Sequence, residues 1–211
     1  MKFRLESGTS DPAAALVLCL HGQGMNEDAF AAPLRRLFSL PAHFLIPRAT
    51  IPMGDDGGAS WYHYDGDQGR FVRELERVEQ ELLRFVSEVE RAHGLEPAAR
   101  ILFGFSQGGY AAGWVALRNP EIFRGLIVSG ARVKTESLDW HDPRMAGAAG
   151  IRILLCHGRR DRLVLPEAAE RSHRELAERG YSVTTQTFGG GHGIHREQIG
   201  AIATWLRVNF L

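Results

Sequence analysis

The chain contains the stretch Ile101-Leu102-Phe103-Gly104-Phe105-Ser106-Gln107-Gly108-Gly109, in which a short apolar run leads into a serine followed by small residues. An apolar run of this length predicts a buried parallel strand, and the residues after it predict a helix. Gly104, Ser106 and Gly108 match the pattern G-x-S-x-G, in which a sharp strand-to-helix turn lifts a serine hydroxyl above the edge of a sheet. Glycine suits both flanking positions because the turn brings the backbone into close contact. The competing interpretation is a plain Gly/Ser-rich turn, so the prediction of a nucleophilic serine depends on the rest of the chain.

Segments typical of strands and of helices alternate along the sequence. Apolar or alternating runs predict strands at 15–20, 43–46, 101–105, 125–130, 151–156 and 181–188. Apolar residues at helical spacing predict helices at 27–38, from 71 to 93, after Ser106, at 166–179 and at 196–208. This alternation predicts an α/β fold with a mostly parallel sheet and helices on both faces, in a single domain that spans residues 1–211.

Two segments lack a regular pattern. Residues 47–60 are rich in Pro and Gly, so we expect a long loop without regular structure, with Trp61 and Tyr62 at its end. These two aromatic side chains either line a substrate pocket or anchor the loop to the body of the protein. Residues 131–150 form a polar connection that is too short for a large cap domain.

A serine hydroxyl becomes a nucleophile only beside a base, and the base needs a carboxylate that orients it. Asp161 follows the predicted strand at 151–156, and His192 lies in a glycine-rich run after the strand at 181–188. The chain order Ser, Asp, His is that of the α/β hydrolases. We therefore predict that Ser106, His192 and Asp161 form a catalytic triad.

Each of these assignments has an alternative. Asp161 is also a candidate for a helix cap or a surface ion pair, and His195 is the rival base. We favour His192 because glycines flank it. A metal site that joins His192 and His195 to His21 or His157 is the weaker interpretation, because no carboxylate stands at a metal-protease spacing such as H-E-x-x-H.

Charge and cysteine content exclude several classes of function. Twenty-five basic and 25 acidic residues give a formal net charge of zero, so no basic surface is expected for nucleic acid. No apolar run approaches the ~18 residues of a membrane span and no signal peptide is recognisable, so we expect a cytoplasmic protein without stable membrane insertion. Cys19 and Cys156 lie in apolar runs and are expected to be buried free thiols. We expect neither a metal nor a cofactor, and the sequence leaves open whether the chain forms a homodimer.

Several motifs occur in a characteristic order: Leu20-His21-Gly22-Gln23-Gly24, Pro47-Arg48-Ala49, Ser60-Trp61-Tyr62, Gly104-Phe105-Ser106-Gln107-Gly108-Gly109, Asp161-Arg162-Leu163-Val164-Leu165-Pro166 and Gly191-His192. Together they resemble the phospholipase/carboxylesterase family of α/β hydrolases, which includes the acyl-protein thioesterases. The resemblance implies Ser106 as nucleophile, His192 as base and Asp161 as orienting carboxylate, on an α/β-hydrolase fold without a large lid. It also implies an oxyanion hole formed by the backbone N–H groups of Gln23 and Gln107.

These observations predict a serine hydrolase that cleaves carboxylic esters or thioesters of short to medium acyl chains through an acyl-enzyme. We expect Trp61 and Tyr62 to form apolar walls of a shallow groove for a small-molecule ester or an acylated substrate. One alternative is a catalytically silent ligand-binding protein on the same fold. Another is a hydrolase that acts on a different acyl bond, such as that of a lysophospholipid, a lactone or a peptide.

Overall fold

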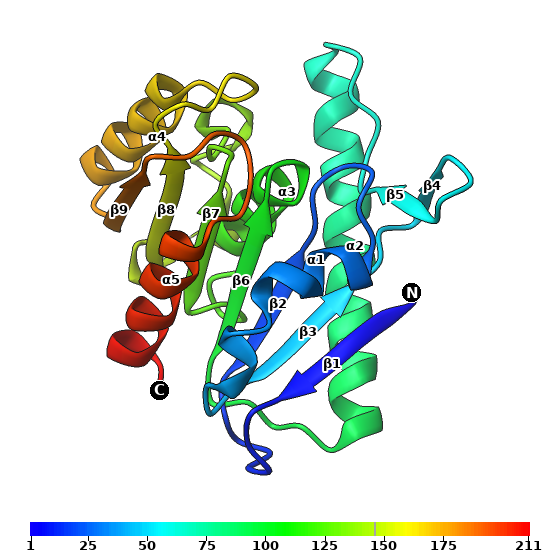
Figure 1. Ribbon diagram of the computed structural model, residues 1–211. Coiled ribbons are helices and arrows are strands. Elements are labelled where there is room, and N and C mark those ends of the chain that lie inside the picture. The colour runs from blue at the N-terminus through cyan, green and yellow to red at the C-terminus, as the bar shows by residue number, and fades with distance from the viewer. Residues whose placement is uncertain (146) are drawn as a thin grey trace.

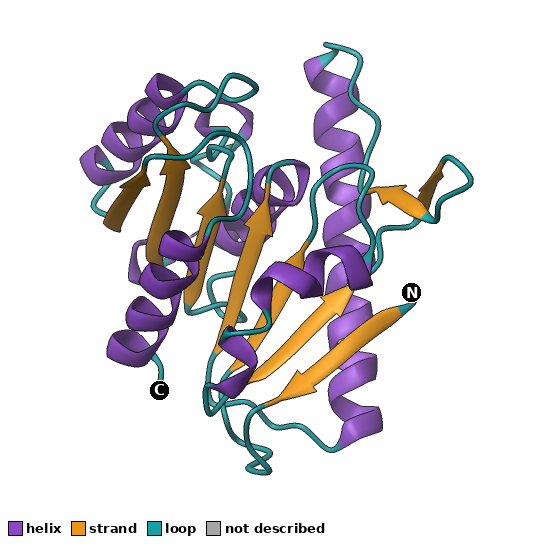
Figure 2. Cartoon of the chain, viewed as in Figure 1, coloured by secondary structure: helices purple, strands orange, loops and turns teal. Residues whose placement is uncertain are grey.

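Within residues 1–145 and 147–211, which the computed structural model describes, the chain builds a seven-stranded sheet (Figures 1 and 2). Its strands follow one another in the order β1 (Phe3–Ser7), β3 (His43–Pro47), β2 (Leu16–Leu20), β6 (Arg100–Phe105), β7 (Gly125–Ser129), β8 (Arg152–Gly158) and β9 (Ser182–Phe188). β1 pairs antiparallel with β3, and the other neighbours in this sheet are parallel. The predicted mostly parallel sheet is therefore confirmed.

Helices cover both faces of the sheet, as predicted. α1 (Glu27–Leu34) and α5 (Arg196–Asn209) lie on one face, whereas α2 (Gln68–His93), α3 (Gln107–Arg118) and α4 (Pro166–Glu178) lie on the other (Figure 1). Successive side chains of a strand point to opposite faces, so each face has its own core. Val17 and Phe103 pack on the α1–α5 side, and Leu18 and Leu102 pack on the α2–α3 side.

The expectation that residues 47–60 hold no regular structure is wrong. β4 (Ile51–Met53) and β5 (Gly58–Ser60) pair antiparallel as a small hairpin outside the main sheet (Figure 1). Gly54 and Gly57 between them adopt positive φ angles of 62° and 73°. Glycine takes these angles without strain, so the residues that suggested an irregular loop form the turn of a hairpin.

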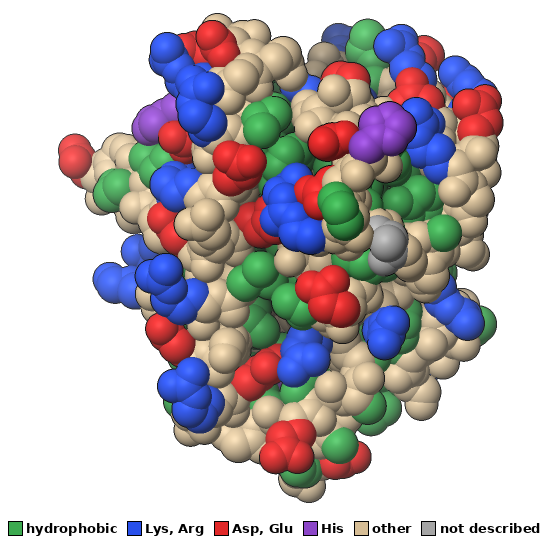
Figure 3. Space-filling model, turned by 180° about the vertical axis from the view of Figure 1, so that it is seen from behind, with side chains coloured by type: hydrophobic (Ala, Val, Ile, Leu, Met, Phe, Trp, Pro, Cys, Tyr) green, Lys and Arg blue, Asp and Glu red, His purple; other side chains and the backbone are tan. Residues whose placement is uncertain are grey.

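Short 3-10 helices occupy several connections: η1 (Leu37–Ser39), η2 (Thr135–Ser137), η3 (Pro143–Met145) and η4 (Ala148–Gly150). Three of them lie in the 131–150 segment, where the sequence shows no periodicity and where residue 146 is outside the described residues. Figure 3 shows acidic and basic side chains interspersed on the face opposite to that of Figure 1. No helix in the described part of the chain is both long and apolar enough to cross a membrane.

The parallel strands place their carboxyl ends at one edge of the sheet, at the top of Figure 1. The loops that follow β2, β6, β8 and β9 therefore meet there. In open α/β sheets this edge is where ligands bind, because loops from separate strands converge on it. It is also where the sequence places each of its candidate catalytic residues.

Candidate active site

Ser106 stands at the sharp turn between β6 and α3. It has a φ of 52° and is the only non-glycine with positive φ among the described residues. A β-carbon on Gly104 would lie 2.1 Å from the carbonyl oxygen of Gly108, and one on Gly108 would lie 2.3 Å from that of Leu20. Both glycines are therefore required by backbone contacts, and the strained serine is held in place by them.

The structure brings Ser106, His192 and Asp161 together from three loops. The Nε2 atom of His192 lies 2.9 Å from the hydroxyl oxygen of Ser106, and its Nδ1 atom lies 2.8 Å from Oδ2 of Asp161. An ionised carboxylate only accepts hydrogen bonds, so Nδ1–H donates to Asp161 and Nε2 is left to accept the serine proton. This is the geometry that a serine nucleophile and its base require.

Asp161 is fixed on its other side by the backbone. Its Oδ1 atom accepts hydrogen bonds from the N–H groups of Leu163 at 2.9 Å and Val164 at 3.0 Å, and the residue is 3% exposed. Burial alone would raise the pKa of Asp161, but the hydrogen bonds from Val164, His192 and Leu163 outweigh it and lower this pKa. The carboxylate therefore stays ionised and oriented beside His192.

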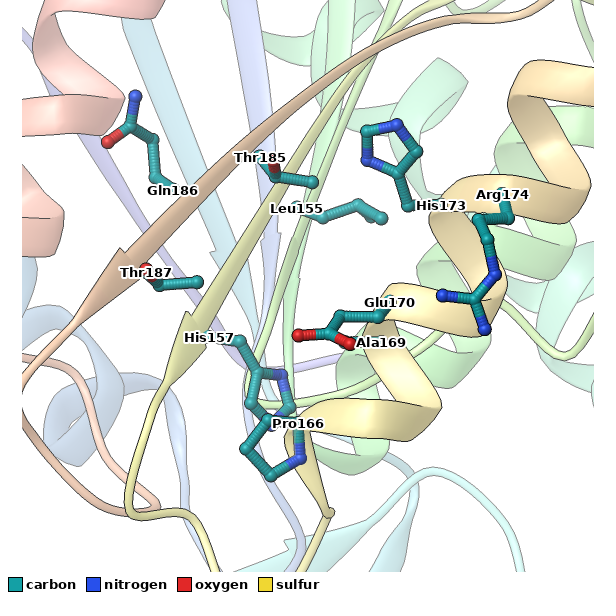
Figure 4. A pocket seen from close by; sticks show the side chains of 10 residues that line it. All are labelled: Leu155, His157, Pro166, Ala169, Glu170, His173, Arg174, Thr185, Gln186 and Thr187. Carbon is teal, nitrogen blue, oxygen red and sulfur yellow. The ribbon is translucent and has the colours of Figure 1, made fainter.

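His157 lies against the same carboxylate. Its Nε2 atom donates to the carbonyl oxygen of Val164 at 2.8 Å and lies 3.5 Å from Oδ2 of Asp161. The ring also lines a separate pocket of about 280 Å³ between α4 and β8–β9, shown in Figure 4. Figure 4 shows His157 beside Pro166, at the end of the pocket opposite His173. No triad residue lines this pocket.

His195, the rival base, lies elsewhere. It precedes the first turn of α5, and its ring packs against Phe188 with 4.9 Å between the ring centroids. Its Nε2 atom is buried without a hydrogen-bond partner in the described residues. Of these two histidines, only His192 therefore contacts the hydroxyl of Ser106.

The other residues of the weaker metal hypothesis have different partners. His21 bonds to backbone groups. The described residues hold no cluster of three or more His, Cys, Asp or Glu side chains arranged to bind a metal. Cys19 and Cys156 are buried free thiols, and burial raises the pKa of Cys156 to about 12.

The backbone N–H groups of Gln23 and Gln107, which the resemblance predicts as an oxyanion hole, belong to residues beside Ser106. Both residues line the same pocket of about 520 Å³ as Ser106, and within the described part of the chain neither N–H donates a hydrogen bond. The carbonyl oxygen of Ser106 accepts from the N–H of Gly109 at 2.8 Å. In a trans peptide the N–H points opposite to the carbonyl, so the Gln107 N–H points out of the helix N-terminus.

His21 orients the other amide. Its Nε2 atom accepts from the N–H of Ala49 at 3.0 Å, so the proton of this neutral imidazole is on Nδ1. That Nδ1–H donates to the carbonyl oxygen of Gly22 at 2.7 Å, and burial lowers the pKa of His21, which favours the neutral ring. With the Gly22 carbonyl turned toward His21, the N–H of Gln23 points away from it.

The side chain of Gln107 forms hydrogen bonds that its position in the sequence does not predict. Its Oε1 atom accepts from the N–H of Trp61 at 2.9 Å, and its Nε2 atom donates to the carbonyl oxygen of Tyr62 at 2.9 Å. The amide also contacts the hydroxyl of Ser60. Gln107 therefore ties the end of the β4–β5 hairpin to the catalytic turn.

Trp61 and Tyr62 differ in their exposure to the site. Trp61 is 2% exposed and its Nε1–H donates to the carbonyl oxygen of His21 at 2.8 Å, so the indole offers no wall to a substrate and instead anchors the loop. This disagrees with the expectation of a substrate-contacting Trp61. Tyr62 lines the pocket that contains Ser106, and its contact with a substrate stays a prediction.

An apolar groove of about 640 Å³ also opens at Ser106. Its lining includes Ser106, His192 and a set of apolar side chains: Met25, Pro33, Met53, Phe105, Leu163 and Ile194. Leu163 is 77% exposed at the rim, which leaves the groove open to solvent. Sequence reasoning missed these residues because they come from five separate segments with no common motif.

Comparison with known proteins agrees with the geometry. The model of the phospholipase/carboxylesterase family matches residues 3–210. The chain belongs to this family. It is 29% identical to carboxylesterase SOBER1 of Arabidopsis thaliana, over 92% of this chain and 90% of that protein.

Members and relatives with solved structures share the fold. The carboxylesterase of Bacillus cereus superposes with a TM-score of 0.80 at 18% identity, over 100% of this chain and 95% of that one. Acyl-protein thioesterase 2 of Zea mays superposes with a TM-score of 0.72 at 21% identity, over 100% and 99% of the two chains. Membership of the phospholipase/carboxylesterase family makes this chain an α/β hydrolase of the phospholipase/carboxylesterase type.

Proposed function

We propose that this protein is a serine esterase that cleaves carboxylic esters or thioesters through an acyl-enzyme on Ser106. The observation that carries the proposal is the continuous hydrogen-bond chain from Ser106 through His192 to Asp161. The alternative of a silent binding protein is less favoured, because a binding protein would have no use for a serine in strained conformation aligned with a base.

In the proposed reaction, His192 takes the proton of Ser106 while the serine oxygen bonds to the carbonyl carbon of the substrate. The carbonyl oxygen becomes negative and accepts hydrogen bonds from the N–H groups of Gln23 and Gln107. The bond to the leaving alcohol or thiol then breaks, and His192 gives its proton to that group. Water repeats the sequence on the acyl-enzyme, which releases the acid and restores Ser106.

The apolar groove supports a preference for short to medium acyl chains. Met25, Met53 and Ile194 can contact a few methylenes, each of which contributes about 0.8 kcal/mol when buried. Because the groove is open at Leu163, methylenes beyond its rim would stay in water. We also propose a cytoplasmic location and a small-molecule or acylated substrate.

The test is hydrolysis of a series of 4-nitrophenyl esters and matching thioesters, from acetyl to palmitoyl, with Ser106→Ala as the blank. We expect kcat/KM to rise with the first added methylenes and then to level off or fall. Activity that peaks at palmitoyl would contradict the short-chain preference. Turnover no greater than that of the blank on every ester and thioester would refute the proposed function.

A further inference from the structure

A second pocket shares Ser106 and Gln23 with the apolar groove but differs from it in chemistry. Its remaining lining is aromatic and polar: Tyr62, His63, Tyr64, Asp65, Arg70, Gln107 and Tyr110. The same three tyrosines also line a neighbouring space of about 290 Å³, whose other lining residues are Phe71, Arg132 and Lys134. The three tyrosines therefore line both the pocket of Ser106 and the space that holds Lys134.

Lys134 is held in a defined position beside this neighbouring space. Its ammonium nitrogen lies 4.3 Å from the ring centroid of Phe71 and 4.9 Å from that of Tyr64. Aromatic faces attract a cation, so both rings fix the charge at this place. The ammonium also donates to Oε1 of Gln68 at 3.0 Å. Few conformations are then left for an otherwise flexible side chain.

Lys134 differs from the neighbouring arginines in its ion-pair partners. Arg132 pairs with Glu136, and Arg70 pairs with Asp65. Lys134 takes part in no ion pair among the described residues. Of the three cations Arg70, Arg132 and Lys134, only Lys134 is thus without an ion-pair partner in the described part of the chain.

The polar hydrogens around this charge are arranged as donors. A lysine ammonium has no acceptor, so the amide of Gln68 must turn its oxygen to Lys134 and its nitrogen to the hydroxyl of Tyr64, which it meets at 2.7 Å. The Tyr64 hydroxyl accepts this bond and keeps its own proton to donate. The Tyr110 hydroxyl makes no hydrogen bond within the described residues. Lys134, Tyr64 and Tyr110 thus offer N–H and O–H groups to a single guest.

We infer that this pocket binds an anionic group, a carboxylate or a phosphate, of the ester that Ser106 attacks. The inference rests on the proposed function, since it assigns a charged substrate to the same nucleophile. Both the acyl part and the alcohol part of an ester adjoin the reacting carbon, so either part can carry the anion into the pocket. The substrate class is therefore an ester that carries an anion in its acyl part or in its alcohol part.

A merely structural lysine is the competing explanation. The same contacts would join the 131–150 segment to the start of α2, because Gln68 and Phe71 lie in its first turn. Loss of such a tie would affect the hydrolysis of charged and neutral esters alike. The ratio of kcat/KM for an anionic ester to that for its neutral isostere separates the two explanations.

The experiment measures this ratio in two arms. In the acyl arm, 4-nitrophenyl monoesters of dicarboxylic acids from glutarate to suberate are compared with the corresponding carboxamides, after subtraction of spontaneous hydrolysis. In the alcohol arm, the butyrate ester of 4-hydroxyphenylacetic acid is compared with that of its carboxamide. We expect a ratio of at least ten in one arm for the wild type, falling as NaCl is raised from 20 to 500 mM.

Lys134→Met should lower that ratio at least fivefold, Lys134→Arg should keep part of it, and Tyr110→Phe should lower it about threefold. Lys2→Met is the matched control, because the chain has two lysines and Lys2 is exposed directly before the edge strand β1. Thermal unfolding of each variant checks that it is folded. If Lys134→Met does not fold, the ratio measured for Tyr110→Phe decides the test.

A ratio near one in both arms, or a ratio that Lys134→Met and Tyr110→Phe leave unchanged, would overturn the anion pocket while the esterase proposal stands. If 4-nitrophenyl butyrate and every other ester are left intact, the proposed function fails, and the anion pocket fails with it.

Discussion

Replacement of Gln107 by alanine is the most informative single change, because it removes the side chain while it keeps the backbone N–H that we propose for the oxyanion hole. The lost amide accepts from the Trp61 N–H at 2.9 Å and donates to the carbonyl of Tyr62 at 2.9 Å. Gln107 is 7% exposed, and Ser60 to Tyr62 are buried as well. Water therefore has little room to replace these bonds.

The magnitude follows from counting what is left unpaired. The Tyr62 carbonyl keeps a hydrogen bond from the Ser60 hydroxyl at 2.8 Å, so it loses one of two partners, which costs about 1 kcal/mol. The Trp61 N–H loses its partner and stays buried, which costs about 1–3 kcal/mol. We expect Gln107→Ala to lower the free energy of unfolding by about 2–4 kcal/mol.

Urea unfolding followed by tryptophan fluorescence measures this difference by linear extrapolation, provided that the slope is unchanged. Gln23→Ala is the matched control. It makes the same chemical change at the other proposed oxyanion residue, whose exposed side chain makes no hydrogen bond within the described residues. We expect it to change the free energy of unfolding by less than about 0.5 kcal/mol. If Gln107→Ala lowers the free energy of unfolding by less than about 1 kcal/mol, or if both variants lower it equally, the Gln107 side chain does not hold the end of the β4–β5 hairpin as described.

Three further outcomes are expected. Asp161→Asn should keep the fold but lower kcat by about 10³–10⁴-fold in steady-state assays, because the amide favours the wrong tautomer of His192; near-native turnover would exclude Asp161 as the orienting group. Because the pKa of Asp161 is lowered, its ionised form stabilises the fold at neutral pH, and this contribution is lost as the pH falls below about 4. The free energies of unfolding of wild type and Asp161→Asn, measured in urea, should therefore converge in acid. A difference in unfolding free energy that stays constant down to about pH 2 would argue against this contribution. His192→Ala should abolish turnover and His195→Ala should reduce it less than tenfold, whereas the reverse order would make His195 the base.

Local patterns were sufficient to predict the main sheet, its helices and the edge at which Ser106, Asp161 and His192 meet. The strands β2, β6 and β7 are continuous apolar runs, and close backbone contacts around a five-residue turn require glycine at positions 104 and 108. Such features depend on neighbours in the sequence, which is why they can be predicted from it. The placement of Asp161 and His192 followed from the rule that loops after parallel strands meet at one edge.

Features that depend on distant contacts were missed. The side chain of Gln107 meets Trp61 across 46 positions, and that contact decides that Trp61 is buried rather than exposed to substrate. Lys134 lies in a segment without periodicity, and its side chain is positioned by contacts with Gln68 and Phe71 at the start of α2, more than 60 positions earlier. No local pattern encodes either contact, so only the folded chain shows them.

The central claim is that Ser106 is activated by His192 and Asp161, and covalent labelling tests it most directly. A fluorophosphonate reacts with a serine only where a base has made the hydroxyl nucleophilic. Intact mass and peptide mapping should find one equivalent bound, on Ser106, with no label on Ser106→Ala and much slower labelling of His192→Ala. A label on another residue, or labelling that persists in Ser106→Ala, would contradict the account.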